Sequence, residues 1–158
     1  MTTPHSDACL MATTASLMVL ARAYRGAADS ALSAYGLSQA TAWPVIVTGR
    51  LGDGVRQGAL AEALGVEGPS LVRVLDQLVS SGLIERREDA HDRRVRTIHL
   101  TPAGHALREK VETVLVKLRR QIFRDVDRTD LQACVRVMDT LKTALGREDT
   151  MVLPEDEH

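Results

Sequence analysis

The sequence has little of what stabilises many small secreted proteins or aromatic-rich cores. Only 3% of its 158 residues are aromatic, so large rings cannot supply most of the core. Its two cysteines, Cys9 and Cys134, are too few and too far apart for a disulfide scaffold. No apolar run is long enough to span a membrane, and the N-terminus lacks the basic start of a signal peptide. We therefore expect a soluble cytoplasmic protein built from helices packed through Ala, Leu and Val.

The motifs of common enzyme classes are also missing. The sequence has no Gly-rich phosphate loop, no nucleophile elbow and no HExxH motif. Its five His show no metal-ligand spacing with Cys, and we expect His99 and His105 to be solvated. These absences predict a protein that is not an enzyme and that uses no metal or other cofactor.

Charge of one sign does not dominate the chain. The formal net charge is −1, and the interval 56–96 holds seven Arg and seven Asp or Glu. The segment 147–158 contains five acids and one Arg, and we expect this Pro-containing tail to be disordered. Any binding of nucleic acid must therefore depend on where individual Arg side chains point, and not on bulk charge.

Two short helices separated by a tight turn are expected in the middle of the chain. The first, over about 57–64, should end at Gly65, and the second, over 69–80, should begin with Pro69 at its first position. The apolar stripe of this second helix, which can pack on the first, consists of Leu71, Val74, Leu75 and Leu78. The opposite face is polar and short in side-chain reach, which would let its backbone approach a groove closely.

A hairpin should follow these helices. Strands are expected at 83–87 and 94–100, joined by a charged tip. In the second strand, the residues expected to face the core are Ile98 and Leu100, in alternation with the outward-facing Thr97 and His99. The order helix, turn, helix, hairpin predicts a winged helix-turn-helix, whose second helix can enter the major groove of DNA.

Long amphipathic helices flank this module. Ser38 and Thr101 are expected helix N-caps, and Thr129 to Gln132 fits a capping box for the last helix, on which Cys134 should be a small core residue. One small lobe could not cover so many apolar helix faces, whereas a two-fold dimer could. We expect a helical dimerisation region that combines residues 8–35 and 102–146. Residues 38–101 should form a winged helix-turn-helix DNA-binding domain, and residues 147–158 an acidic tail. The fold class is thus mainly α with a small β-wing.

The sequence resembles the multiple-antibiotic-resistance regulator (MarR) family of bacterial transcription factors. The resemblance is most specific in two segments. The segment from Gly65 to Leu78 is similar to the recognition helix of the SlyA-like branch. The segment Asp92-Arg93-Arg94, followed by Ile98-His99-Leu100-Thr101, is similar to the wing signature of the family.

The resemblance implies a homodimer in which each subunit binds half of an inverted-repeat operator in double-stranded DNA, and we expect a repressor. It places Arg73 on bases in the major groove, with N-terminal contacts of the same helix from Pro69, Ser70 and Leu71. Gln77 on the polar face is a further candidate contact. Arg94, with Arg93 beside it, would enter the minor groove, where an A·T-rich sequence concentrates negative potential. Asp92 would hold the wing by pairing with an Arg.

The resemblance also implies a small aromatic acid as effector. Possible lining residues are Trp43, Arg22 and Arg25, although Trp43 also fits a core position and the two Arg also fit solvated or dimer-bridging positions. Cys9 raises the alternative of a cysteine-based redox-sensing regulator of the same fold. A second alternative is a winged-helix protein-interaction module without DNA binding, which the neutral charge of the central region supports.

Overall fold

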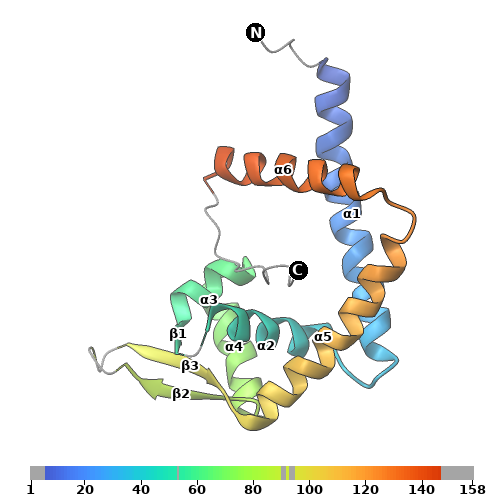
Figure 1. Ribbon diagram of the computed structural model, residues 1–158. Coiled ribbons are helices and arrows are strands. Elements are labelled where there is room, and N and C mark those ends of the chain that lie inside the picture. The colour runs from blue at the N-terminus through green and yellow to red at the C-terminus, as the bar shows by residue number, and fades with distance from the viewer. Residues whose placement is uncertain (1–5, 53, 90–91, 93–94, 147–158) are drawn as a thin grey trace.

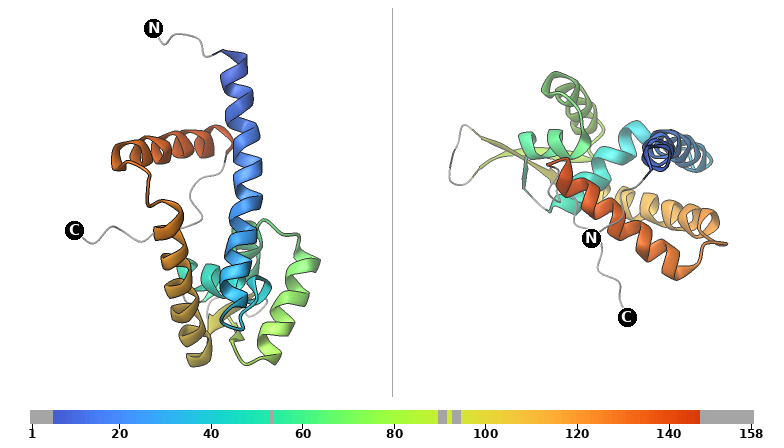
Figure 2. Two further views of the ribbon diagram at one scale, coloured as in Figure 1. Left: turned by 90° about the vertical axis from the view of Figure 1, so that its right-hand side faces the viewer. Right: turned by 90° about the horizontal axis from the view of Figure 1, so that it is seen from above.

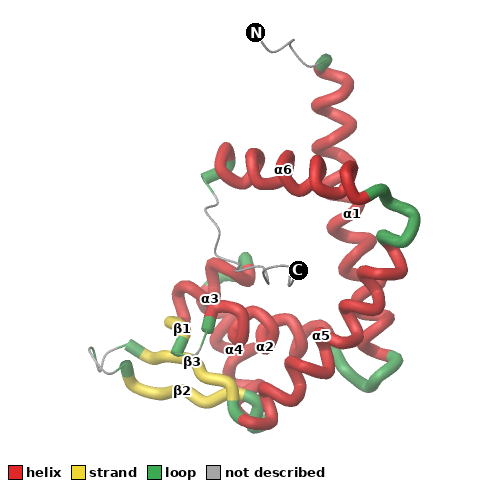
Figure 3. Tube along the Cα trace, viewed as in Figure 1, coloured by secondary structure: helices red, strands yellow, loops and turns green. Residues whose placement is uncertain are grey.

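The protein is mainly helical with one small sheet, as predicted (Figures 1 and 3). The structure is a computed structural model and describes residues 6–52, 54–89, 92 and 95–146. In chain order the elements are α1 (Asp7–Ser33), α2 (Gln39–Leu51), β1 (Val55–Arg56), α3 (Gln57–Leu64), α4 (Gly68–Ser80), β2 (Ile84–Glu88), β3 (Arg96–Leu100), α5 (Pro102–Ile122) and α6 (Arg128–Ala144).

The sheet is antiparallel, with the strand order β1-β3-β2. The expected hairpin is confirmed, with a register that runs from Ile84 opposite Leu100 to Glu88 opposite Arg96. β1 was not predicted, because two residues are too few to show an alternating pattern. It pairs with β3 and ties the start of α3 to the hairpin.

Thr97 is buried, although it shares the outer face of β3 with His99, opposite Ile98 and Leu100 of the core. Its hydroxyl lies 3.4 Å from the main-chain oxygen of Arg87 and 2.9 Å from Nε2 of His99. His99 is half-buried rather than solvated, whereas His105 is exposed as expected. A buried hydroxyl with hydrogen-bond partners is tolerated, so Thr97 can be covered by its neighbours on this face of the sheet.

α2 lies between two clusters of core residues. Val45 and Val47 pack with α3, α4 and the sheet, in a cluster that also contains Leu60, Leu71, Leu75, Leu78, Ile84, Ile98 and Leu100. Ala42 and Ile46 pack instead with α1 and α5, in a cluster that also contains Ala28, Leu32, Val111, Val114 and Leu115. Because α2 contributes to both cores, it connects the winged helix to the long flanking helices.

α1 and α6 extend away from these cores (Figures 1 and 2). None of the residues of α6 is buried, and the buried residues of α1 are Ala28 and Leu32, near its C-terminal end. The prediction that Cys134 is a core residue is wrong for the described chain, because Cys134 is exposed. None of the described helices combines the length and apolar character needed to cross a membrane.

The helix ends follow local chemistry, with one correction. Ser38 and Thr101 are N-caps as predicted, since their hydroxyls accept from the main-chain N–H groups of Thr41 and Gly104 at 3.3 and 3.1 Å. The predicted capping box at Thr129 is wrong. Asp127 is the N-cap of α6 instead, and its carboxylate accepts from the main-chain N–H of Thr129 at 2.7 Å. This hydrogen bond lowers the pKa of Asp127.

Candidate nucleic-acid interface

The turn between α3 and α4 sets the angle at which α4 is presented. Gly65 ends α3 in the left-handed conformation with φ 64°, and the N–H of Val66 returns to the carbonyl of Ala61 at 3.1 Å. α4 then starts at Gly68. Pro69 therefore stands at the second helical position, whereas the sequence predicted it at the first. It still lies within the first turn, where a missing N–H leaves no helical hydrogen bond unmade.

α4 has a buried face and an outer face. Leu71, Leu75 and Leu78 are almost completely buried in the core, whereas the residues on the outer side that are exposed include Pro69, Ser70, Arg73 and Gln77. Leu71 was expected among the DNA contacts, but its side chain is 0% exposed. The structure therefore corrects this assignment, because a side chain that fills the core cannot also touch a ligand at the surface.

Asp89 holds the base of the wing through contacts with α3 and with both sides of the hairpin tip. The Asp89 carboxylate is 12% exposed and lies 3.2 Å from Nη2 of Arg56, the N-cap residue of α3. Its other oxygen accepts from the main-chain N–H of Asp92 at 3.3 Å, and its own N–H donates to the carbonyl of Val95. Asp89 thus connects the hairpin to the helix-turn-helix. Arg56 and Asp89 are 33 residues apart in the sequence, so no local pattern could have predicted this pair.

The predicted wing contacts, Arg93 and Arg94, lie outside the described residues. Asp92 is described and exposed, and its pairing with an Arg stays a prediction. The described strands β2 and β3 fix where the tip begins and ends, since Glu88 and Arg96 face each other across the hairpin.

Two connections join the winged helix to α5. At the sheet end, the hydroxyl of Thr101 donates to the carbonyl of Gly82 at 2.6 Å, and the N–H of Thr101 donates to the carbonyl of Leu83 at 3.1 Å. On α2, the guanidinium of Arg50 donates to Oε1 of Glu112 at 2.7 Å, while Arg119 lies 3.6 Å from the other oxygen. Because α5 leads out to α6, these contacts set the orientation of the winged helix relative to the flanking helices.

Comparison with known proteins agrees with this geometry. The sequence profile of the MarR family matches residues 35–95. The crystal structure of transcriptional regulator PA3341 is 35% identical in sequence and superimposes with a TM-score of 0.77, over 86% of this chain and 99% of that one. The chain belongs to the MarR family of transcriptional regulators. Members of this family regulate transcription and are not enzymes, in agreement with the prediction from the sequence.

Other MarR-family structures share the fold. CouR from Rhodococcus jostii RHA1, bound to p-coumaroyl-CoA, is 25% identical with a TM-score of 0.70, over 81% of this chain and 87% of that one. A variant of MarR from E. coli in complex with operator DNA is 18% identical with a TM-score of 0.71, over 84% of this chain and 94% of that one, and shows likeness of fold alone.

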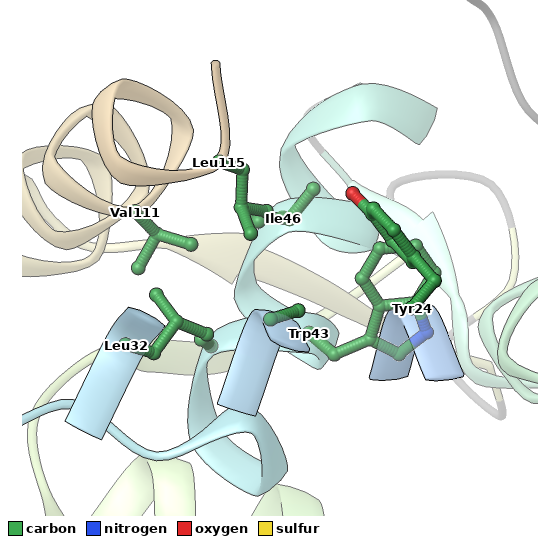
Figure 4. A pocket seen from close by; sticks show the side chains of 8 residues that line it. Tyr24, Leu32, Trp43, Ile46, Val111 and Leu115 are labelled. Atoms are coloured by element: carbon green, nitrogen blue, oxygen red, sulfur yellow. The ribbon is translucent and has the colours of Figure 1, made fainter. Parts of the chain in front are cut away.

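This MarR-family chain has a small apolar cavity between α1, α2 and α5 (Figure 4). Its volume is about 20 Å³, which is room for about one water molecule. The rings of Tyr24 and Trp43 lie at one end, and the remaining lining residues are Ala28, Leu32, Ala42, Ile46, Val111 and Leu115. Trp43 is thus brought to a cavity, whereas Arg22 and Arg25 are exposed on α1 and do not line it.

A second, more open pocket of about 280 Å³ lies at the turn between α1 and α2. It is lined by Gly36, Leu37, Ser38, Thr41, Ala42 and Leu107, so its polar groups are hydroxyls and main-chain atoms. Cys9 is free and exposed near the start of α1. Within the described part of the chain, no three His, Cys, Asp or Glu residues are grouped closely enough to hold a metal ion.

Proposed function

We propose that this MarR-family protein is a homodimeric transcriptional repressor of the SlyA-like branch that binds an inverted-repeat operator. Each subunit would place α4 in the major groove of one half-site and its wing in the adjacent minor groove. The observation that carries the proposal is the outer face of α4. There Arg73 is exposed and makes no hydrogen bond or ion pair with any other described residue, on a helix whose opposite face is locked into the core.

The outer face of α4 suits close approach to base edges. Pro69 and Ser70 are short and exposed at its N-terminal end, so the helix backbone can sit deep in a groove. Arg73 has the length and the paired donors to bind O6 and N7 of a guanine, and the Gln77 amide can bind an adenine edge. Arg93 and Arg94 remain predicted minor-groove contacts on the basis of sequence and resemblance. The DNA-binding unit would be residues 38–101.

Exposed apolar surface supports the dimer. Large hydrophobic side chains that are exposed in the single chain are concentrated on the flanking helices, and include Leu10, Met11, Met18, Val19 and Leu20 on α1 and Val135 and Val137 on α6. A monomer rarely leaves so many such side chains together on extended helices. A second copy would cover them through residues 8–35 and 102–146, and would place two copies of α4 at a set distance.

Selection of bound fragments from genomic DNA tests the proposal and defines the operator. On that operator, Arg73→Ala should weaken binding by about 1–3 kcal/mol and relax the preference at one base pair per half-site. Arg124→Ala, an exposed change in the α5–α6 connection, is the matched control and should bind as wild type does. Affinity should fall steeply with added salt, as expected for phosphate contacts. Equal binding by wild type and Arg73→Ala would refute the assignment of α4, and a flat salt dependence would favour a protein-interaction module.

Release by a small aromatic carboxylate is the second part of the proposal. Its support is the position of the cavity at the junction of α1, α2 and α5, together with the aromatic acyl ligand of CouR, the structural neighbour described above. An aromatic acid is much larger than the present cavity, so binding there would have to separate α2 from α1 or α5. That movement would change the distance between the two α4 helices, and Arg22 and Arg25 would have to turn inward to meet the carboxylate.

The intrinsic fluorescence of Trp43 provides the assay, because this is the one Trp in the chain. Titration with salicylate should change the Trp43 emission and release the operator over the same concentration range. Benzamide, which lacks the negative charge, is the matched control ligand. If neither signal changes at millimolar salicylate, the proposed response to a salicylate-like acid at this cavity is refuted.

A further inference from the structure

A carboxylate stands beside Arg73 on the outer face of α4. Asp76 follows Arg73 by three residues, and residues at this spacing are neighbours on a helix surface. Asp76 is also exposed, with 57% of its side chain accessible. A carboxylate in this position has two effects that oppose DNA binding, because it can capture the guanidinium of Arg73 and it repels the phosphates of a groove.

Asp76 is held by a different cation. Nη1 of Arg86, on β2, lies 2.7 Å from Oδ1 of Asp76. Arg86 comes two residues after the buried Ile84, so its side chain leaves the strand on the same face of the sheet, the face on which Leu75 and Leu78 of α4 pack. The pair therefore links the outer side of α4 to the strand that leads into the wing.

The environment of Arg86 indicates that its guanidinium pairs with Asp76 and does not bind a DNA phosphate. Its side chain is 30% exposed, and its Nε is buried without an acceptor among the described residues. A buried N–H without a partner costs free energy. In the observed geometry, Nη1 of Arg86 pairs with Asp76 although Nε is left without an acceptor among the described residues. An Arg that bound phosphate would instead extend its whole guanidinium into solvent.

We propose that Arg86 is a positioning residue for operator recognition, which occupies the Asp76 carboxylate and thereby leaves Arg73 available to the major groove. Arg86 also neutralises the charge of Asp76 next to the phosphates. The inference rests on the proposed role of Arg73 in reading the operator. It adds that the strand at the base of the wing controls the availability of Arg73, through a residue that does not touch DNA.

A double-mutant cycle on operator affinity tests the proposal, with wild type, Arg86→Met, Asp76→Asn and the double variant. In Arg86→Met, Asp76 is free to pair with Arg73 and faces the phosphates, so affinity should fall about three- to tenfold. The double variant has no carboxylate to neutralise and should bind within about twofold of wild type. Asp76→Asn alone should bind at least as tightly as wild type. Arg86→Lys, which keeps the charge, should retain most of the affinity.

A second readout separates positioning from general stability. The guanine that Arg73 contacts is replaced by 7-deazaguanine, which lacks the N7 acceptor. Wild type should distinguish the two operators, Arg86→Met should distinguish them less, and the double variant should regain the discrimination. Urea unfolding of each variant shows whether the fold is kept, and Asp76→Asn and Arg86→Lys carry the test if Arg86→Met does not fold.

The outcomes separate this inference from the proposed function. If the double variant binds as weakly as Arg86→Met, Arg86 contacts DNA itself and the inference is overturned. The same holds if Asp76→Asn binds more weakly than wild type. If Arg73→Ala binds the selected operator as wild type does, the proposed role of α4 fails and the inference fails with it.

Discussion

Replacement of Gly104 by Ala should destabilise the protein by about 2–3 kcal/mol, although alanine is the better helix former. Gly104 is buried near the start of α5, where the helix crosses the end of the preceding turn. A Cβ at this position would lie 2.1 Å from the carbonyl oxygen of Leu83. Ordinary contacts between carbon and oxygen are no shorter than about 3.3 Å, so α5 or the turn must retreat by about 1 Å.

The magnitude follows from what that retreat would break. Both hydrogen bonds of Thr101, to the carbonyls of Gly82 and Leu83, span the same contact, and each contributes about 0.5–1.5 kcal/mol. Overpacking of a tight core contact costs about 1–3 kcal/mol, and the helix propensity of Ala returns about 0.5–1 kcal/mol. With one of the two hydrogen bonds lost and each contribution near the middle of its range, the net loss is about 2–3 kcal/mol, which for a chain of this size lowers Tm by roughly 4–12 °C.

Urea unfolding at a fixed protein concentration measures this loss, since the stability of the proposed dimer would depend on concentration. Gly49→Ala in α2 is the matched control. Its Cβ would lie 2.5 Å from Cδ of Arg108, a flexible side chain that can swing away, so the loss should stay below about 1 kcal/mol. The reasoning is refuted if Gly104→Ala is as stable as wild type, or if the two variants lose the same free energy.

Three further predictions test other parts of the structure. Glu112→Gln should lower the free energy of unfolding by about 1–3 kcal/mol, because the side chain of Arg50 is 11% exposed and its pair with Glu112 would lose the negative charge. Urea unfolding measures this loss, with Arg124→Ala as a control. Asp89→Asn should weaken operator binding, measured by fluorescence anisotropy. The free energy of unfolding, measured in urea, should change by less than about 1 kcal/mol, since Arg56 of the pair is largely exposed. A variant that loses stability but binds the operator as wild type does would contradict this prediction. The lowered pKa of Asp127 means that its charged form caps α6 at neutral pH and that this contribution is lost as the pH falls below about 4 through the lowered pKa. Helicity measured by circular dichroism should then fall less steeply with acid in Asp127→Asn, and an unchanged acid profile would count against the cap.

Local signals in the sequence predicted the helices well. The expected helix at 8–35 is observed as α1 (Asp7–Ser33), and the caps at Ser38 and Thr101 are confirmed. These features depend on residues within one or two turns of each other. The capping box at Thr129 is wrong although its residues fit the motif, because Asp127, two residues earlier, offers a charged acceptor to the Thr129 N–H.

Features that depend on distant residues could not be read from the sequence. β1 is two residues long, and its strand character comes from pairing with Ile98 and Thr97 of β3. The burial of Thr97 depends on neighbouring residues of the sheet that only the fold brings together. The pair between Arg56 and Asp89 joins groups 33 residues apart, which no pattern indicates.

The sequence by itself determined that this chain contains a helix-turn-helix and hairpin between long amphipathic helices, because helical periodicity, caps and turn residues are local. It also marked Arg73 as a candidate contact, since a single Arg stands on an otherwise short polar face. Only the tertiary structure decided that Leu71 belongs to the core and that Asp76 is held by Arg86 on β2. The physical reason is that burial and ion pairing depend on which elements meet in space, and the strand that neutralises Asp76 reaches α4 only after the hairpin has packed.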